Sequence, residues 1–165
     1  MSSLLIIIPV ALVLVTLQAT VVERFTIAGV PPDLILVSIL LLTMISGRAA
    51  ATLAVIIIAP ISDAISGLPL GTSILPLLTV VYLAGFGESS LFGTRLGWPV
   101  VVAIAGTILA GLITLFELSL LGWNIQWSDT FLRILLPSVV LNAVLVFLLY
   151  IPTDYLRERR TLSLR

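Results

Sequence analysis

The sequence contains no cysteine, no histidine and no lysine, so that all eight of its basic residues are arginines. Without cysteine and histidine, the chain lacks thiol nucleophiles, histidine bases and the commonest zinc and haem ligands. Without lysine, it has neither a Schiff-base lysine nor the phosphate-binding lysine of a P-loop. The formal net charge is zero and there is no basic stripe, which argues against nucleic acid as a partner. We therefore expect no cofactor, no metal site and no catalytic residue.

Charge of either sign is also scarce. Charged residues make up 10% of the chain and hydrophobic residues 60%, whereas a soluble domain carries about 25% charged residues. Six apolar runs are separated by short segments rich in charge, glycine and proline, and they cover residues 4–22, 34–45, 49–65, 70–86, 98–121 and 131–151. These runs predict an all-α, polytopic membrane protein. Residues 1–151 would form a single domain of six transmembrane helices, and residues 152–165 a short Arg-rich cytoplasmic tail.

The second and third runs are short for membrane spans. Between Asp33 and Arg48 the helix would extend about 21 Å, while the hydrocarbon core of a bilayer is about 30 Å thick. We expect two crossings joined by a tight turn at Ser46-Gly47-Arg48.

The arginine distribution predicts the orientation of the chain. No arginine precedes Leu4, so we expect the first run to be a retained helix and not a cleaved signal. With six spans, Arg24 and Arg133 lie on one side of the membrane. The side that carries both termini receives the other arginines, which are Arg48, Arg95, Arg157, Arg159, Arg160 and Arg165. Because arginine accumulates on the cytoplasmic side, both termini should be cytoplasmic.

Asp63 is the most informative polar position. It lies about 21 Å along the third run, near the outer hydrocarbon boundary. A carboxylate within a span is costly, and such residues are often functional. Two interpretations remain open: Asp63 caps the following turn at Ser66-Gly67, or it contacts a partner or ligand.

Other polar residues favour structural roles. Asp33 follows Pro31-Pro32, which is typical of a helix start. Gln18 in the first run and Asn142 near the middle of the last run are expected to form hydrogen bonds between helices. Because no two carboxylates share a helix turn within a run, an enzyme is not expected. A packing or scaffold role in a larger membrane complex remains.

Three motifs, in order along the chain, resemble those of MreD, the rod shape-determining membrane protein family of bacteria. Leu17-Gln18-Ala19-Thr20 closes the first run, and Pro32-Asp33-Leu34 opens the second. The segment 61–67, followed by Pro69-Leu70-Gly71, is similar to the family signature Gly-Leu-x-x-Asp…Gly…Leu-Gly. The chain departs from this signature at its front, where Pro60-Ile61 stands in place of Gly-Leu.

The resemblance implies a non-catalytic scaffold subunit of the cell-elongation complex, which makes peptidoglycan, in the bacterial inner membrane. Its partners would be MreC, a single-span protein, and also RodA, the penicillin-binding protein that works with RodA, and the MreB cytoskeleton. The residues implied to bind a partner or to maintain structure are Gln18, Pro32, Asp33, Asp63, Gly67 and Gly71.

The resemblance also implies a fold like that of the substrate-binding subunits of energy-coupling-factor transporters. This likeness keeps an alternative function open, a small-molecule (vitamin) binding subunit of an uptake transporter. Such a subunit needs a polar pocket on its outer side, for which the sequence offers mainly Asp63, Asn124 and Gln126.

Overall fold

The computed structural model describes residues 2–20, 26, 29–86 and 97–162, and within them every regular element is helical. Arg24, Arg95 and Arg165, which contribute to the predicted orientation, lie outside the described residues. The helices are α1 (Ser2–Thr20), α2 (Leu34–Ser66), α3 (Ile74–Gly85), α4 (Gly97–Leu120), α5 (Trp127–Thr130), the π-helical turn η3 (Phe131–Leu135) and α6 (Leu136–Leu162).

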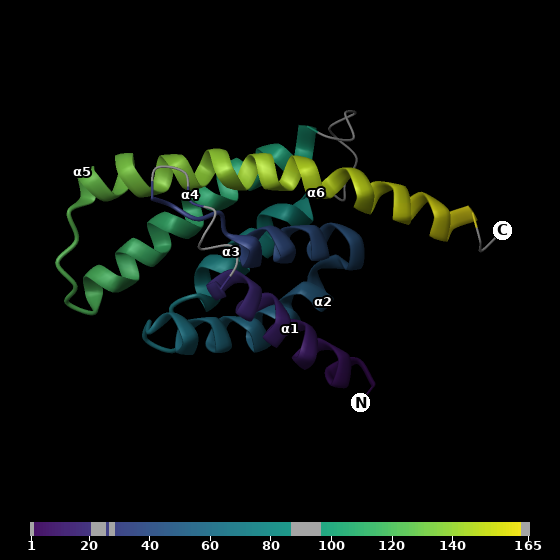
Figure 1. Cartoon of the computed structure of the whole chain (residues 1–165), viewed down its shortest axis with the longest axis horizontal. Coiled ribbons are helices and arrows are strands. Elements are labelled where there is room, and N and C mark those ends of the chain that lie inside the picture. Colours follow the sequence, from purple (N-terminus) through teal and green to yellow (C-terminus); the bar gives the residue numbers. More distant parts are fainter. Residues whose placement is uncertain (1, 21–25, 27–28, 87–96, 163–165) are drawn as a thin grey trace.

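Helix α2 is two helical segments joined at Gly47. Gly47 has φ 82° and ψ 169°, a conformation outside the helical region that is essentially restricted to glycine. The break lies within the segment 46–48, where the sequence predicts a turn between two spans. In Figure 1 the chain reverses at this point, and the two segments of α2 run back past each other.

The core lies where α2 packs against α1, α3 and α6, with α4 closing the bundle against α3 and α6. The largest fully buried aliphatic side chains come from α2, α3 and α6 and include Val37, Leu40, Val55, Val80 and Val146. The starting end of α1 and the final end of α6 lie on the same side of the molecule (Figure 1).

Helix α4 buries a face of small residues. Ala103, Gly106, Thr107 and Ala110 are all buried, and a Cβ atom on Gly106 would lie 3.4 Å from Val80 Cγ2 of α3. Small residues allow helix backbones to approach closely. The structure places α3 against this face.

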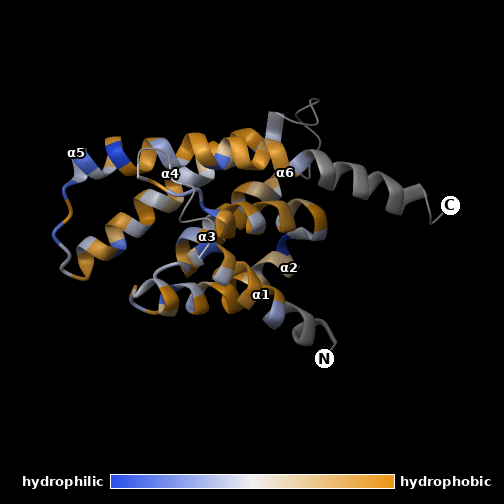
Figure 2. Ribbon diagram, viewed as in Figure 1, coloured by the Kyte–Doolittle hydropathy of each residue, from blue (hydrophilic) through white to orange (hydrophobic). Residues whose placement is uncertain are grey.

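Helices α4 and α5–η3–α6 form an antiparallel pair joined at residues 121–126 (Figure 1). Helix α4 ends in a Schellman motif, because Trp123 N donates to Leu118 O and Gly122 N donates to Ser119 O. Figure 2 shows hydrophobic residues along most of both helices and hydrophilic residues around the connection and α5. Many of these apolar side chains are exposed on the isolated chain, among them Phe116, Leu120, Leu132, Val140 and Leu148.

Among the described residues, three helices are long and apolar enough to cross a membrane: Leu34–Ser66, Gly97–Leu120 and Trp127–Tyr150. Pro9–Thr20 and Ile74–Gly85 are shorter apolar helices. The expectation of an all-helical protein with membrane-spanning helices is therefore confirmed at this level. The last helix differs from its predicted bounds, because it starts at Trp127 and α6 continues through Pro152 to Leu162.

Candidate functional site

The polar side chains of the bundle gather in two hydrogen-bonded junctions, with a cavity between them. The first junction holds the start of α2. Gln18 at the end of α1 binds this segment twice: its Nε2 donates to Pro32 O (3.1 Å), and its Oε1 accepts from Leu34 N (2.8 Å). Asn142 of α6 accepts from Asp33 N through its Oδ1 (2.7 Å). Three separate parts of the chain are joined at this point.

Asp33 is the N-cap of α2, and its Oδ1 accepts a hydrogen bond from Leu36 N (2.8 Å). This is the usual role of an aspartate at a helix start, where the first backbone amides lack partners within the helix. The backbone of Asp33, with φ −95° and ψ 90°, is extended, as an N-cap requires. The structure thus places Asp33 at the helix start expected from its sequence context.

The first junction extends into α4 through Asn142. This residue is buried, and its Nδ2 donates to Thr107 Oγ1 (3.2 Å). One amide side chain therefore links α6 both to α4 and to the start of α2. Pairing both ends of the amide is necessary here, because an unpaired polar group in an apolar interior is costly.

The second junction is the turn between α2 and α3, and Asp63 holds it at both ends. The backbone carbonyl of Asp63 accepts from Gly67 N and from Leu68 N (3.0 Å), which terminates α2. Its carboxylate accepts from Gly71 N (2.7 Å), from Ser73 N (3.3 Å) and from Ser73 Oγ. Ser73 is the N-cap of α3. Asp63 therefore stabilises both the end of α2 and the start of α3.

The glycines of this turn have backbone conformations that other residues seldom adopt. Gly67 has φ +69° and Gly71 has φ +100°, and both values lie in the left-handed region that favours glycine. A side chain at either position would meet at most one neighbouring atom, at 4.0 Å. The backbone conformation, and not lack of space, therefore requires glycine at these two positions.

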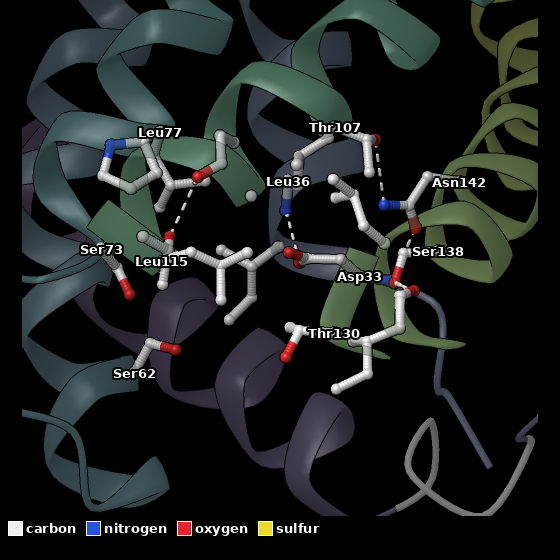
Figure 3. A pocket seen from close by; sticks show the side chains of 17 residues that line it. Asp33, Leu36, Ser62, Ser73, Leu77, Thr107, Leu115, Thr130, Ser138 and Asn142 are labelled. Atoms are coloured by element: carbon white, nitrogen blue, oxygen red, sulfur yellow. Dashed lines mark hydrogen bonds between the residues drawn. The ribbon is translucent and has the colours of Figure 1, made fainter. Parts of the chain in front are cut away.

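Between the junctions lies a cavity of about 260 Å³. It is formed by α2, α3, α4 and the α5–η3–α6 helix, and its apolar wall includes Ile35, Leu77, Leu115 and Leu135. Its polar side chains are Asp33, Ser62, Ser73, Thr107, Thr114, Thr130, Ser138 and Asn142. Figure 3 shows the Asp33 carboxylate near the middle of these groups, with Thr107 and Asn142 on one side and Ser73 on the other.

The structure brings some of the residues singled out in the sequence together and separates others. Gln18, Pro32 and Asp33 meet in the first junction, while Asp63, Gly67 and Gly71 form the second. Asn124 lies in the exposed connection before α5 and Gln126 is the N-cap of α5; neither lines the cavity.

The sequence reasoning missed the six hydroxyl residues of the cavity. Serine and threonine are common in membrane helices, where they bond their own backbone, so no single one of them is a signal.

Comparisons with protein-family models, curated proteins and solved structures returned no match to this chain.

Proposed function

We propose that this protein is a non-catalytic scaffold subunit of the bacterial cell-elongation complex, similar to MreD, and that it binds MreC in the inner membrane. RodA, the penicillin-binding protein that works with it and the MreB cytoskeleton would be reached through the same assembly. The proposal rests on the resemblance of motifs between Gln18 and Gly71. One structural observation supports it: these motif residues form the two junctions that fix the helix ends.

The second junction also suggests where a partner would bind. The Asp63 side chain is fully buried and its oxygens accept hydrogen bonds from its own turn, so it needs no donor from a partner. Leu70 at the tip of the turn is 74% exposed and Ile65 is 50% exposed. We propose that MreC contacts this turn through Leu70 and Ile65, while Asp63 keeps the turn in shape.

A matched pair of variants tests this proposal. Leu70→Ser removes an exposed apolar side chain without touching the Asp63 hydrogen bonds, and Leu53→Ser removes one that is 55% exposed on α2. With MreC co-expressed, we expect Leu70→Ser to reduce MreC recovery in a pull-down by up to about tenfold, as loss of one buried leucine predicts. Leu53→Ser should leave recovery unchanged. Absence of MreC from the pull-down of the unaltered protein would refute the proposed function.

We also propose six crossings with both termini in the cytoplasm. The crossings would be α1, the two segments of α2, α3, α4 and Trp127–Tyr150. The position of both chain ends on one side of the bundle supports an even number (Figure 1). Because the chain has no cysteine, Ser3→Cys, Ser128→Cys and Ser163→Cys can be labelled singly in intact cells. Only Ser128→Cys, at the opposite end of the bundle, should react with an impermeant reagent from outside.

The cavity favours a second candidate, a small-molecule binding subunit of an energy-coupling-factor-type uptake transporter. It combines an apolar wall with several polar groups, which is the usual composition of a small-molecule site. The two candidates differ in what accompanies the purified protein: a partner protein for the scaffold, or a small ligand for the transporter subunit. Native mass spectrometry of the detergent-solubilised complex distinguishes them.

A further inference from the structure

Three of the hydroxyl groups around the cavity have already used their hydrogen atoms. Each hydroxyl carries a single donor and two acceptor lone pairs. Thr114 Oγ1 donates to Ala110 O (3.0 Å), Ser138 Oγ donates to Ile134 O (2.8 Å), and Ser73 Oγ donates to the Asp63 carboxylate. These three groups therefore offer only lone pairs to whatever occupies the cavity.

The charged residues of the cavity lining also favour a ligand that donates hydrogen bonds. Asp33 is the one charged residue among the described residues that line it, and neither arginine nor lysine contributes to the lining. The Asp33 carboxylate accepts from the backbone amides at the start of α2, Leu36 N at 2.8 Å and also Ile35 N. A carboxylate enclosed in an apolar bundle is stabilised by a positive group that pairs with it. The lining thus combines one carboxyl group and at least three acceptor-only hydroxyls with no basic residue among the described residues.

The remaining surface of the cavity is apolar, and the space is small. A volume of about 260 Å³ lies just below the range of about 300–1,000 Å³ typical of pockets for drug-sized ligands. Ile35, Leu77 and Leu115 supply part of the apolar wall. These dimensions suit a compact molecule with an apolar body and one polar end.

We propose that this cavity binds a small organic ammonium ion with an apolar body. The ammonium group, which carries only donors, pairs with Asp33 and with the lone pairs of the neighbouring hydroxyls. The apolar body packs against the leucine and isoleucine side chains. The site is compatible with either function proposed above and depends on neither.

Three probes that share one apolar body test the charge preference. They are 2-phenylethylamine, which is protonated at neutral pH, the neutral 2-phenylethanol and the anionic 3-phenylpropionate. Binding to the full chain in lipid nanodiscs is measured by calorimetry, and the heat from empty nanodiscs is subtracted. We expect the amine to bind about tenfold more tightly than the alcohol, as a charge-assisted hydrogen bond predicts, and the carboxylate to bind least. Equal binding of the three probes, or no binding, overturns the proposal.

Asp33→Asn removes the charge but keeps an oxygen for the helix cap, because asparagine is as good an N-cap as aspartate. We expect this variant to bind the amine and the alcohol equally. A retained preference for the amine would mean that Asp33 does not hold the ammonium group, which contradicts the proposed site.

Thr114→Met fills the cavity, and the hydroxyl it removes bonds only its own helix. Its matched control is Thr79→Met on α3, where the hydroxyl bonds Leu75 O in the same way (2.9 Å) and the residue does not line the cavity. We expect Thr114→Met to lose amine binding and Thr79→Met to retain it. Equal amine binding by both variants would place the probe outside the cavity and refute the site. MreC recovery is measured separately, so failure of this site leaves the scaffold proposal unaffected.

Discussion

Asn142 Oδ1 lies 2.7 Å from Asp33 N, so a side chain of α6 holds a backbone amide that precedes it by 109 residues. Gln18 Oε1 accepts from the next amide, that of Leu34, at 2.8 Å. Two helices that are distant in sequence thus hold adjacent peptide groups. The position of the start of α2 therefore depends on the Gln18 and Asn142 side chains.

The adjacency predicts that Gln18 and Asn142 are energetically coupled. We expect Gln18→Leu and Asn142→Leu each to destabilise the protein by about 1–3 kcal/mol, because each leaves buried backbone or side-chain groups unpaired. Once one side chain is lost, the segment can shift, so the double variant should cost less than the sum of the single ones. Unfolding in detergent gives the stability of the unaltered protein, the two single variants and the double variant. Additivity within about 0.5 kcal/mol would contradict the coupling.

Asp63→Asn should separate turn-building from partner contact. The asparagine oxygen can still accept from Gly71 N and Ser73 N, which share one carboxylate oxygen, but its NH₂ group replaces the oxygen that accepts from Ser73 Oγ. Since the negative charge is lost as well, we expect a loss of about 1–3 kcal/mol. MreC recovery, normalised to folded protein, should stay the same. Asp129→Asn in the exposed part of α5 is the control and should change neither quantity. A fall in MreC recovery with unchanged melting temperature would assign the carboxylate to the partner instead.

The positive-φ glycines should differ in their tolerance of substitution. At Gly67, with φ +69° and open space where a Cβ atom would lie, alanine should cost about 1–2 kcal/mol. Asparagine, which tolerates the left-handed region, should cost less. Gly47→Ala should cost more than Gly67→Ala, because φ 82° with ψ 169° is nearly inaccessible to other residues. Melting temperatures of the three variants in detergent test this order. A Gly47→Ala protein that melts no lower than Gly67→Ala would contradict it.

The contact between α4 and η3 predicts that Gly111 and Leu135 are energetically coupled. A Cβ atom on Gly111 would collide with Leu135 Cδ1, so Gly111→Ala should destabilise the protein by about 1–3 kcal/mol through overpacking. Gly106→Ala is the control, because its Cβ would lie 3.4 Å from Val80 Cγ2 and fit with little change. Leu135 is itself buried, so Leu135→Ala alone should cost about 2–5 kcal/mol, and the double variant should cost less than the sum of the two single variants. Equal stabilities of the two glycine variants would show that this packing is less tight than the structure indicates.

The sequence predicts the helical architecture well because its signals are local. Apolar runs, the prolines before Asp33 and the glycines after Asp63 each specify a helix or its end within a few residues. By contrast, the pairing of Asn142 with Asp33 depends on how distant helices pack, and periodicity within one helix does not reveal it. The interpretation of Asp63 as a turn cap agrees with its hydrogen bonds, while its proximity to a partner remains a prediction.

Helix bounds and the cavity show the limits of sequence reasoning in physical terms. The last apolar run ends at Ile151, but α6 continues through Pro152 to Leu162, although proline usually ends or kinks a helix. The cavity is lined in large part by small hydroxyl residues from several helices. Each of them has an ordinary structural explanation alone, and only their convergence in space distinguishes them.

The π-helical turn η3 affects how α5 is oriented around the axis of α6. Leu136 N donates to Phe131 O across five residues, so the turn amounts to one inserted residue in an α-helix. One residue corresponds to a rotation of about 100° around the helix axis. A related chain with one residue fewer at 131–135 would turn Trp127–Thr130 toward a different part of the surface, while Asn142 kept its place in the first junction. The α5 end of this helix can therefore be re-aimed by a single deletion without disturbing the hydrogen bonds that hold the bundle together.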